Sequence, residues 1–278
     1  MTTRQASPKS TKNVTSDFVK RFLGQAIVLI LFLLGWYALA YGLENNFSPA
    51  SNTPMIIPPP HRLFEDVHGI VRTKILIAFW ISLKTSLIGL TLSIGIGLTL
   101  GVLMAQAKWL ERSLWPYLIA LQVTPIIAIV PLMIKLVGSN FAARVLVTVI
   151  ISLFPIVSNT LFGIQSTPKN MHDLFTLHKA SRFTRLIKLQ LPAASPAIFG
   201  GLRISAGLAV IGAIVGDFFF AKGDPGLGKL ITQFFLNSQA GAMFVTALAA
   251  TVLGLIFFAI FGMVNNWAVN RWYEGSIY

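Results

Sequence analysis

The chain has 278 residues, of which 55% are hydrophobic and 11% are charged. Soluble domains usually carry about 25% charged residues, so the composition excludes an ordinary soluble fold and indicates an integral membrane protein. The net charge of +13 does not indicate a nucleic-acid partner, because no soluble basic face is available. An excess of Lys and Arg on the cytosolic side of a membrane explains it better. The absence of cysteine excludes disulfides, thiolate metal sites and cysteine catalysis.

The first 21 residues are polar and precede a long apolar run. Residues 1–21 contain five Lys or Arg and one acid, Asp17. The run over 22–43 is too long for a signal peptide, and no clear small-residue cleavage site follows it. We therefore predict a disordered cytosolic N-terminal tail over 1–21 and a first membrane span over 22–43.

Mostly uncharged stretches of about 20 residues, the length that crosses a bilayer as a helix, predict the remaining spans. These are residues 85–107, 113–134, 145–166, 197–219 and 243–265. Residues 61–80 instead mix charged and apolar side chains, which predicts an amphipathic helix on the membrane surface. The expected fold class is an all-α membrane protein with about six transmembrane helices. Its membrane domain covers 22–265, and a short cytosolic tail covers 266–278.

Glycines and prolines mark two of these spans. Small residues let helices approach closely in lipid, and the span at 85–107 contains Gly89, Gly95, Gly97 and Gly101. The span at 113–134 contains Pro116, Pro125 and Pro131. Because prolines free backbone groups that protein neighbours must satisfy, we predict a kinked, interior helix. Pro125 and Pro131 are candidates for lining a pathway or gate, and simple packing is the alternative explanation.

A basic segment separates the fourth and fifth spans. The distribution of Lys and Arg places the N-terminus and residues 165–196 in the cytosol. After Thr167-Pro168, a good helix start, the pattern predicts two short helices broken near Ala180-Ser181. Such a helix could dock a cytosolic partner or hold anionic membrane lipid with its basic residues. The residues alone leave both explanations open.

The sequence KASRFTRLIKLQLPAASPAIFGGLR, residues 179–203, resembles the signature loop of binding-protein-dependent ABC importer permeases of the type I fold. The matching positions are Ala180-Ser181, Leu191-Pro192-Ala193-Ala194, Pro196 and Gly201-Leu202-Arg203. Asp173 stands where the family has glutamate, and Lys179 replaces the family's glycine. The resemblance covers about residues 55–265, through IIPPPHRLFEDV, LQVTPIIAIVPLMIKLVG, FPIVSNTLFGI and DPGLGKLI.

The resemblance implies that this loop is a coupling helix docked on an ATP-hydrolysing subunit. The implied ATPase-coupling residues are Asp173, His178, Lys179, Ala180, Ser181, Arg182 and Pro192. It also implies a bacterial inner-membrane location, an extracytoplasmic solute-binding protein and a second permease copy, as a homodimer. No Walker motif occurs in the sequence, so we expect no cofactor on this chain and ATP use by the partner.

Asp217, at the outer end of the fifth span, is a further pathway or gate candidate, because an intramembrane acid is expensive and often functional. The alternative is a helix-end acid that faces water or pairs with a lysine such as Lys222. Arg203 and Lys84, near span ends, fit side chains that extend to the interface or form ion pairs. The four histidines form no ligand pair within an apolar span, so we predict neither a metal site nor catalytic residues.

The resemblance favours a thiamine-pyrimidine precursor or riboflavin as the transported solute, with nitrate, a sulfonate or taurine as the alternative. Two other classes of protein were weighed against an importer subunit. A secondary transporter usually has inverted repeats and buried coupling acids, and a membrane enzyme needs a polar catalytic set at one depth. Neither pattern occurs in the sequence.

Overall fold

The computed structural model describes residues 12–47, 57–65, 67–138, 140–218 and 223–273, and these contain helices but no strand. The helices are α1 (Lys12–Phe47), η1 (Pro60–Arg62), α2 (Ile70–Gln106), α3 (Lys108–Val123), α4 (Ile126–Val137), α5 (Asn140–Gln165), α6 (Lys169–Leu177), α7 (Arg182–Arg185), the π-helical turn η2 (Leu186–Gln190), α8 (Leu191–Phe218), α9 (Leu227–Leu236) and α10 (Ala240–Tyr273). Five are long and apolar enough to cross a membrane, or six spans result if the bent pair α3–α4 counts as one. The all-α class with about six spans is confirmed.

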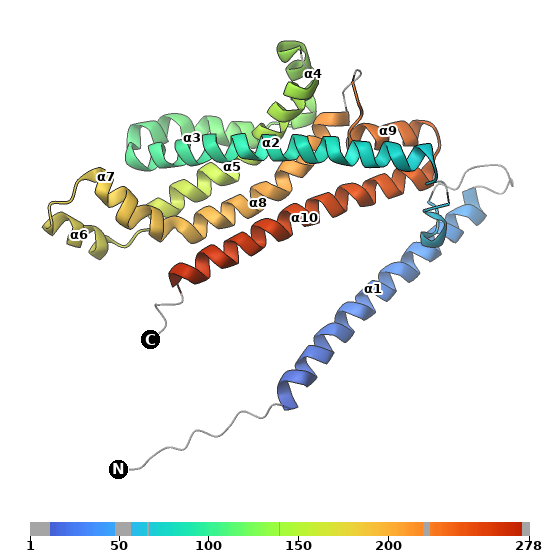
Figure 1. Ribbon diagram of the computed structural model, residues 1–278, viewed down its shortest axis with the longest axis horizontal. Helices are drawn as coiled ribbons and strands as arrows, with labels where there is room; N and C mark the ends of the chain where they lie inside the picture. Colours follow the sequence, from blue (N-terminus) through green and yellow to red (C-terminus); the bar gives the residue numbers. More distant parts are fainter. Residues whose placement is uncertain (1–11, 48–56, 66, 139, 219–222, 274–278) are drawn as a thin grey trace.

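Helices α5 and α8 form the centre of the bundle. They pack extensively against each other, α2 packs on α5, and α10 packs on α8. Figure 1 shows α6 and α7 at one end of this bundle and α9 at the other. One apolar cluster joins α2, α8, α9 and α10 through residues such as Leu90, Val210, Leu230 and Leu253. The bundle therefore has two ends, one at α6 and α7 and one at α9, and the long packed helices run between them.

The glycines of α2 allow its close packing on α5. A Cβ atom at Gly97 would lie 2.8 Å from the Cβ of Ile156, and one at Gly101 would lie 2.6 Å from the Cβ of Thr160. A Cβ at Gly95 would meet nothing within 4 Å. The predicted close contact between helices at small residues therefore occurs between α2 and α5, and Gly95 is not part of it.

The third span is broken, not kinked and interior as predicted. Helices α3 and α4 meet at an angle of 103°, and α4 turns away from α3 in Figure 1. Pro125 has no amide hydrogen and disfavours helical geometry in the residue before it. Thr124 accordingly has an extended ψ of 128°. Pro125 and Pro131 are both exposed in the single chain, so neither is interior.

The prediction of a separate surface helix over 61–80 is wrong. Only the short turn η1 forms at its start, and residues from Ile70 onward belong to the long helix α2. Gly69, with a positive φ of 52°, turns the chain just before α2. The charged side chains that suggested a surface helix, Arg72 and Lys74, lie exposed on the first turns of α2.

The two chain ends also differ from expectation. Residues 12–21 were expected to be disordered but are helical, because they contain no proline or glycine and continue directly into α1; residues 1–11 lie outside the described part. Helix α10 extends to Tyr273, beyond the predicted boundary at 265. Figure 1 shows α1 diverging from the bundle. It is held near its C-terminal part, where the Trp36 indole N–H donates to the Pro58 carbonyl at 3.1 Å.

Candidate functional site

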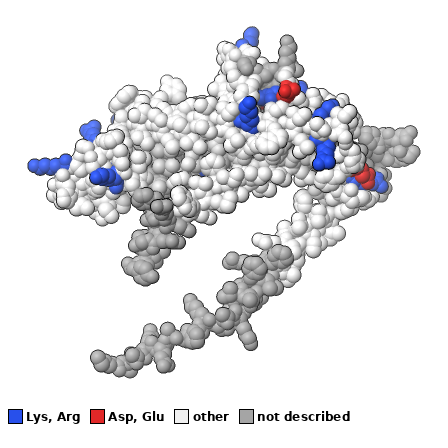
Figure 2. Space-filling view, in the orientation of Figure 1, with Lys and Arg blue, Asp and Glu red and all other residues white. Residues whose placement is uncertain are grey.

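Charged side chains form two separate groups on the face drawn in Figure 2. Lys and Arg gather at the end formed by α6 and α7 and again over the part of the bundle that carries α4 and α9, and the surface between the two groups is largely uncharged. An uncharged belt between two charged ends is what a bilayer requires. The two ends are therefore candidate sites for partners on opposite sides of the membrane.

At one end, residues 166–190 form an exposed hairpin, here named the coupling hairpin. Helices α6 and α7 are separated at residues 178–181, which confirms the predicted break near Ala180-Ser181. The Ser181 hydroxyl accepts a hydrogen bond from the Thr184 backbone N–H at 3.1 Å and caps α7. The Arg185 guanidinium donates to the Thr176 hydroxyl at 3.0 Å. These bonds cap α7 and join it to α6.

Most of the proposed coupling side chains lie on the surface of this hairpin. Ala180 and Pro192 are half-buried; the exposed ones are Asp173, His178, Lys179, Ser181 and Arg182. The structure therefore brings the hairpin residues together on one accessible element, while Pro192 lies in the first turn of α8. No partner contact tests their role, so ATPase coupling stays a prediction.

Lys179 adopts the left-handed backbone conformation, with a φ of 49°. Its N–H donates to the Thr176 carbonyl at 2.9 Å, and the Ala180 N–H donates to the Phe175 carbonyl at 3.0 Å. This pair of bonds is the Schellman motif that ends a helix, and its left-handed position strongly favours glycine. A lysine therefore occupies a left-handed position here, at a cost of about 1 kcal/mol.

Two side-chain amides tie this end of the bundle together. The Gln106 amide at the end of α2 donates to the Gln190 side-chain oxygen at 2.8 Å. The Gln165 amide at the end of α5 donates to Glu111 of α3 at 2.8 Å. Sequence reasoning missed both contacts, and the only signal was a glutamine at the end of each apolar stretch.

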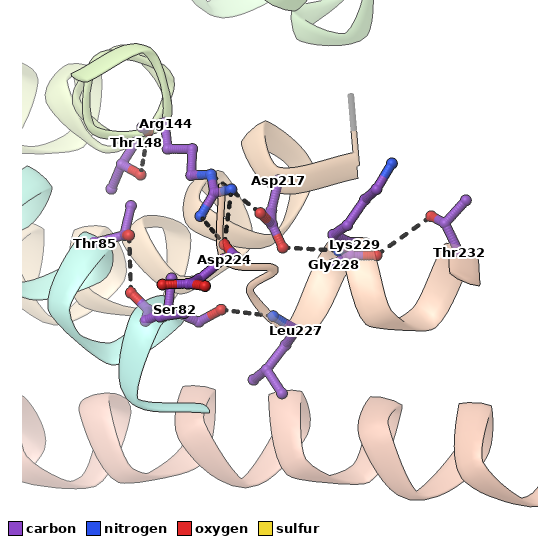
Figure 3. A network of polar contacts seen from close by, with 11 residues as sticks. Ser82, Thr85, Arg144, Thr148, Asp217, Asp224, Leu227, Gly228, Lys229 and Thr232 are labelled. Atoms are coloured by element: carbon purple, nitrogen blue, oxygen red, sulfur yellow. Dashed lines mark hydrogen bonds and ion pairs between the residues drawn. The ribbon is translucent and has the colours of Figure 1, made fainter. Parts of the chain in front are cut away.

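At the opposite end, Asp217 lies in a buried polar network (Figure 3). The Arg144 Nε and Asp217 Oδ1 atoms are 3.1 Å apart, and the two side chains are 5% and 2% exposed. The other carboxylate oxygen accepts the Lys229 backbone N–H at 2.7 Å. Arg144 also donates from both terminal nitrogens to the Asp224 carbonyl at 3.2 Å. The ion pair therefore joins α5, α8, α9 and the loop before α9.

Two glycines allow the loop to approach this acid. A Cβ atom at Gly226 would lie 2.7 Å from Asp217 Oδ2, and one at Gly228 would collide with the Ile214 carbonyl. The Leu227 N–H donates to the Ser82 hydroxyl at 2.9 Å, which fastens the same loop to α2. The sequence DPGLG thus serves as a close-packed turn beneath the ion pair.

The structure gives Asp217 a partner that sequence reasoning did not identify. Arg144 lies about 70 residues away, just before the fourth apolar stretch, and nothing in the sequence indicates that it pairs with Asp217. The suggested partner Lys222 lies outside the described residues. The alternative of a water-exposed acid is wrong, because Asp217 is 1% exposed. Its contacts are those of a residue that fastens a loop, and a direct role in the pathway or gate stays a prediction.

The break between α3 and α4 borders a cavity of about 400 Å³. Its lining comes from α3, α4, the break, α5 and α8: Leu121, Gln122, Val123, Thr124, Pro125, Ile126, Ile150, Ile151, Phe154, Pro155 and Leu208. Pro125 thus lies at a cavity wall, whereas Pro131 does not line it. Val123, Thr124 and Pro125 are exposed, so the cavity opens to the surface of the single chain.

Arg203 and Lys84, the two cations predicted near span ends, pack on aromatic rings. The Arg203 guanidinium lies 4.1 Å from the Phe258 ring centre, and the Lys84 ammonium lies 5.6 Å from that of Phe141. Such contacts stabilise a cation where few water molecules reach it. Within the described ranges, no three His, Asp or Glu side chains are grouped so that they could hold a metal ion.

The bundle, its exposed hairpin and the close-packed turn define a membrane subunit with one partner-accessible end on each side. Residues 97–270 match the family model described as "binding-protein-dependent transport system inner membrane component". The chain belongs to this family, which makes it a permease subunit of an ABC importer. Hydrolysis of ATP belongs to a separate subunit in such systems.

Two relatives and one solved structure illustrate the similarity. Formylaminopyrimidine transport permease protein ThiX of Halalkalibacterium halodurans is 34% identical over 64% of this chain and 71% of its own. Riboflavin transport system permease protein RibX of Chloroflexus aurantiacus is 32% identical over 90% of each. A chain of the inward-facing MetNI methionine ABC transporter is similar with a TM-score of 0.64 at 18% identity, over 72% of this chain and 99% of that one. At that identity, the last similarity concerns the fold alone.

Replacing Asp217 by Asn tests whether the buried pair is a structural fastening. The change leaves the Arg144 charge buried without its counter-charge, which we expect to cost about 3–5 kcal/mol. Thermal unfolding of the purified permease in detergent should show a clear loss of stability. Asp224→Asn is the matched control, because Asp224 is exposed and its backbone carbonyl, which the change keeps, accepts from Arg144. A normally stable D217N protein with defective transport would instead support a direct role in the pathway.

Replacing Lys179 by Gly tests the strain in the coupling hairpin. Glycine adopts the left-handed conformation without strain, so we expect the folded hairpin to be stabilised by about 1 kcal/mol relative to its opened form. Amides of α6 and α7 should then exchange with deuterium about fivefold more slowly. The neighbouring change Ala180→Gly is the control, since Ala180 has an ordinary negative φ and gains only chain entropy in the unfolded hairpin. Equal or faster exchange in K179G would contradict the Schellman assignment.

Proposed function

We propose that this permease carries a small neutral organic solute, a thiamine-pyrimidine precursor or riboflavin, across a bacterial inner membrane. In this proposal the coupling hairpin faces the cytosol and docks on an ATPase subunit. A homodimer of the chain forms the pathway, and an extracytoplasmic solute-binding protein delivers the solute to the opposite end. The observation that carries the proposal is the continuous helical path from the exposed hairpin into the central helix α8.

The hairpin is mechanically connected to the bundle. Helix α7, the turn η2 and α8 follow one another without a gap from Arg182 to Phe218. A displacement of the hairpin is therefore passed to α8, which packs on α5 and α10. At its far end α8 carries Asp217, which accepts from the Lys229 N–H in the first turn of α9 and pairs with Arg144. Helix α8 thus links the hairpin, the proposed contact with the ATPase, to the loop before α9, the proposed contact with the binding protein.

The turn η2 supplies a place where this path can bend. A π-helical turn is a local widening of the helix that recurs at functional sites. Here it lies at the junction between the hairpin and α8, and Gln190 within it bonds to Gln106 of α2. Nucleotide-driven closure of the ATPases would bias such an element between two states by contacting one of them better.

We place the second copy of the chain against the broken span, where the cavity opens and apolar side chains that would otherwise face lipid are exposed in the single chain. Val123 is 75% exposed, Ile127 58%, Leu132 53% and Leu136 69%. The cavity at the break opens on the same helices. A partner copy that covered this face would bury apolar surface and close the cavity into a shared pathway.

The proposed solute follows the names of the two relatives described above, which refer to a formylaminopyrimidine and to riboflavin. These two molecules share a flat nitrogen heterocycle without a fixed charge. The separate binding protein would select between them, because the permease receives the solute from that protein.

Reversing the charge of Arg182 tests the docking of an ATPase. Arg182 is exposed at the start of α7, so Arg182→Glu should leave the fold intact while opposing an interface built for a cation. We expect at least a tenfold loss of ATPase co-purification and a matching loss of ATP-driven solute uptake in proteoliposomes. Arg72→Glu is the control, because Arg72 is also exposed but lies in the first turn of α2, away from the hairpin. This variant should retain the complex with the ATPase.

The same variant distinguishes the lipid explanation of the hairpin. If R182E keeps its ATPase and its uptake but binds vesicles rich in anionic lipid less well, the hairpin is a lipid contact and the docking proposal is wrong.

A further inference from the structure

The cavity at the break between α3 and α4 carries an inference about the ligand that it admits. We propose that it is a binding site, within the membrane, for a neutral flat heteroaromatic ring that bears N–H donor groups. This inference rests on the proposed transport function and adds to it a location, a set of contacts and a chemical class of ligand.

The cavity lies near the middle of the membrane-spanning bundle. Its α5 residues, 150–155, fall midway along a helix that runs from residue 140 to residue 165. Leu208 likewise falls near the middle of α8. The cavity volume of about 400 Å³ lies within the usual range for small-molecule sites. Broken helices at this depth are a recurrent way for transporters to build a substrate site.

The cavity walls are apolar and uncharged. None of the lining residues is Asp, Glu, Lys, Arg or His. Phe154 supplies an aromatic ring, and Ile150, Ile151 and Leu208 supply aliphatic surface. Rings stack favourably on such a side chain and gain from leaving water. The side chain of Gln122 adds one amide that can both donate and accept.

Two prolines each remove a helical hydrogen-bond donor from the carbonyl of a residue that lines the cavity. In a helix, the carbonyl of residue i accepts from the N–H of residue i+4, and proline has no N–H. Pro125 therefore removes the helical donor of the Leu121 carbonyl, and Pro155 removes that of the Ile151 carbonyl. Leu121 and Ile151 both line the cavity. Backbone acceptors at membrane depth must be satisfied by protein, water or ligand, and an amino or ring N–H group is a suitable donor.

The same features disfavour an anion. Nitrate and sulfonate groups offer acceptors only, so carbonyl oxygens repel them, and no cationic side chain lines the cavity to offset their desolvation. The opposing feature is the start of α4, where Pro125 provides no side-chain cap and the first N–H groups carry a partial positive charge. This partial charge is too small to offset the cost of removing water from a full anion, so the cavity favours a neutral ring that bears donor groups.

A cysteine in the cavity provides the test, because the chain has no cysteine of its own. In the purified complex of permease and ATPase, Leu208→Cys should react with a small maleimide. Saturating formylaminopyrimidine or riboflavin should slow that reaction at least fivefold, and sodium nitrate or an alkanesulfonate should not. Ser238→Cys, at an exposed turn after α9, should show no protection by any of them.

Phe154 and Phe162 provide a matched pair for the site itself. Both lie on α5 and contact the Trp115 ring, at 5.9 and 5.2 Å between ring centres, but only Phe154 lines the cavity. In the L208C background, Phe154→Leu should raise the ligand concentration needed for half-protection about tenfold. Phe162→Leu should leave it unchanged.

Four outcomes decide the matter. Protection by a heteroaromatic ligand that weakens in F154L alone supports the inference. Protection by nitrate or sulfonate overturns the ligand class, and absence of protection by all four compounds, or equal effects of the two Phe changes, overturns the site. ATP-driven uptake by the same preparation is measured separately, so its failure counts against the transport function and leaves the binding result intact.

Discussion

The structure depends on one constraint: inside a membrane, each backbone polar group needs a partner from the protein itself, from trapped water or from a ligand. Long helices satisfy this constraint along their length, which explains why α2, α5, α8 and α10 are continuous. The difficulty is then concentrated where a helix breaks. Pro125 creates such a place between α3 and α4, while Pro155 removes one backbone donor inside the continuous helix α5. The residues that lose a helical donor, Leu121 and Ile151, line one cavity, which we propose as a binding site.

The ends of the bundle solve a related problem with side chains. At one end, Arg144 and Asp217 form a buried ion pair that also bonds to the Asp224 carbonyl and the Lys229 N–H, and the Leu227 N–H donates to Ser82 of α2. Together these contacts secure the loop before α9 and the first turn of α9. At the other, a serine cap and a Schellman motif shape a hairpin that stands clear of the core. Helix α8 belongs to both arrangements. A permease driven by a separate motor needs such a connection, since a displacement produced outside the membrane must reach the pathway through a continuous element.

Much of this architecture could be predicted from local sequence. The length of apolar stretches set the number of spans, and the hairpin's break was visible because Ala180-Ser181 interrupts an amphipathic pattern. Local patterns failed where the outcome depended on partners distant in sequence. Nothing near Asp217 indicates Arg144, and Gly95 resembles Gly97 until the position of Ile156 is known. The break at Pro125 was underestimated because a proline alone does not distinguish a kink from a turn of 103°; the extended Thr124 makes the difference.

The central claim is that the coupling hairpin lies in the cytosol, opposite the turn after α9. Single cysteines at positions 181 and 238, each exposed in the structure, test it directly in a chain with no other thiol. A membrane-impermeant maleimide should label S238C in intact spheroplasts and should label S181C only after permeabilisation. Labelling of S181C in intact spheroplasts, with S238C protected, would invert the topology and contradict the account.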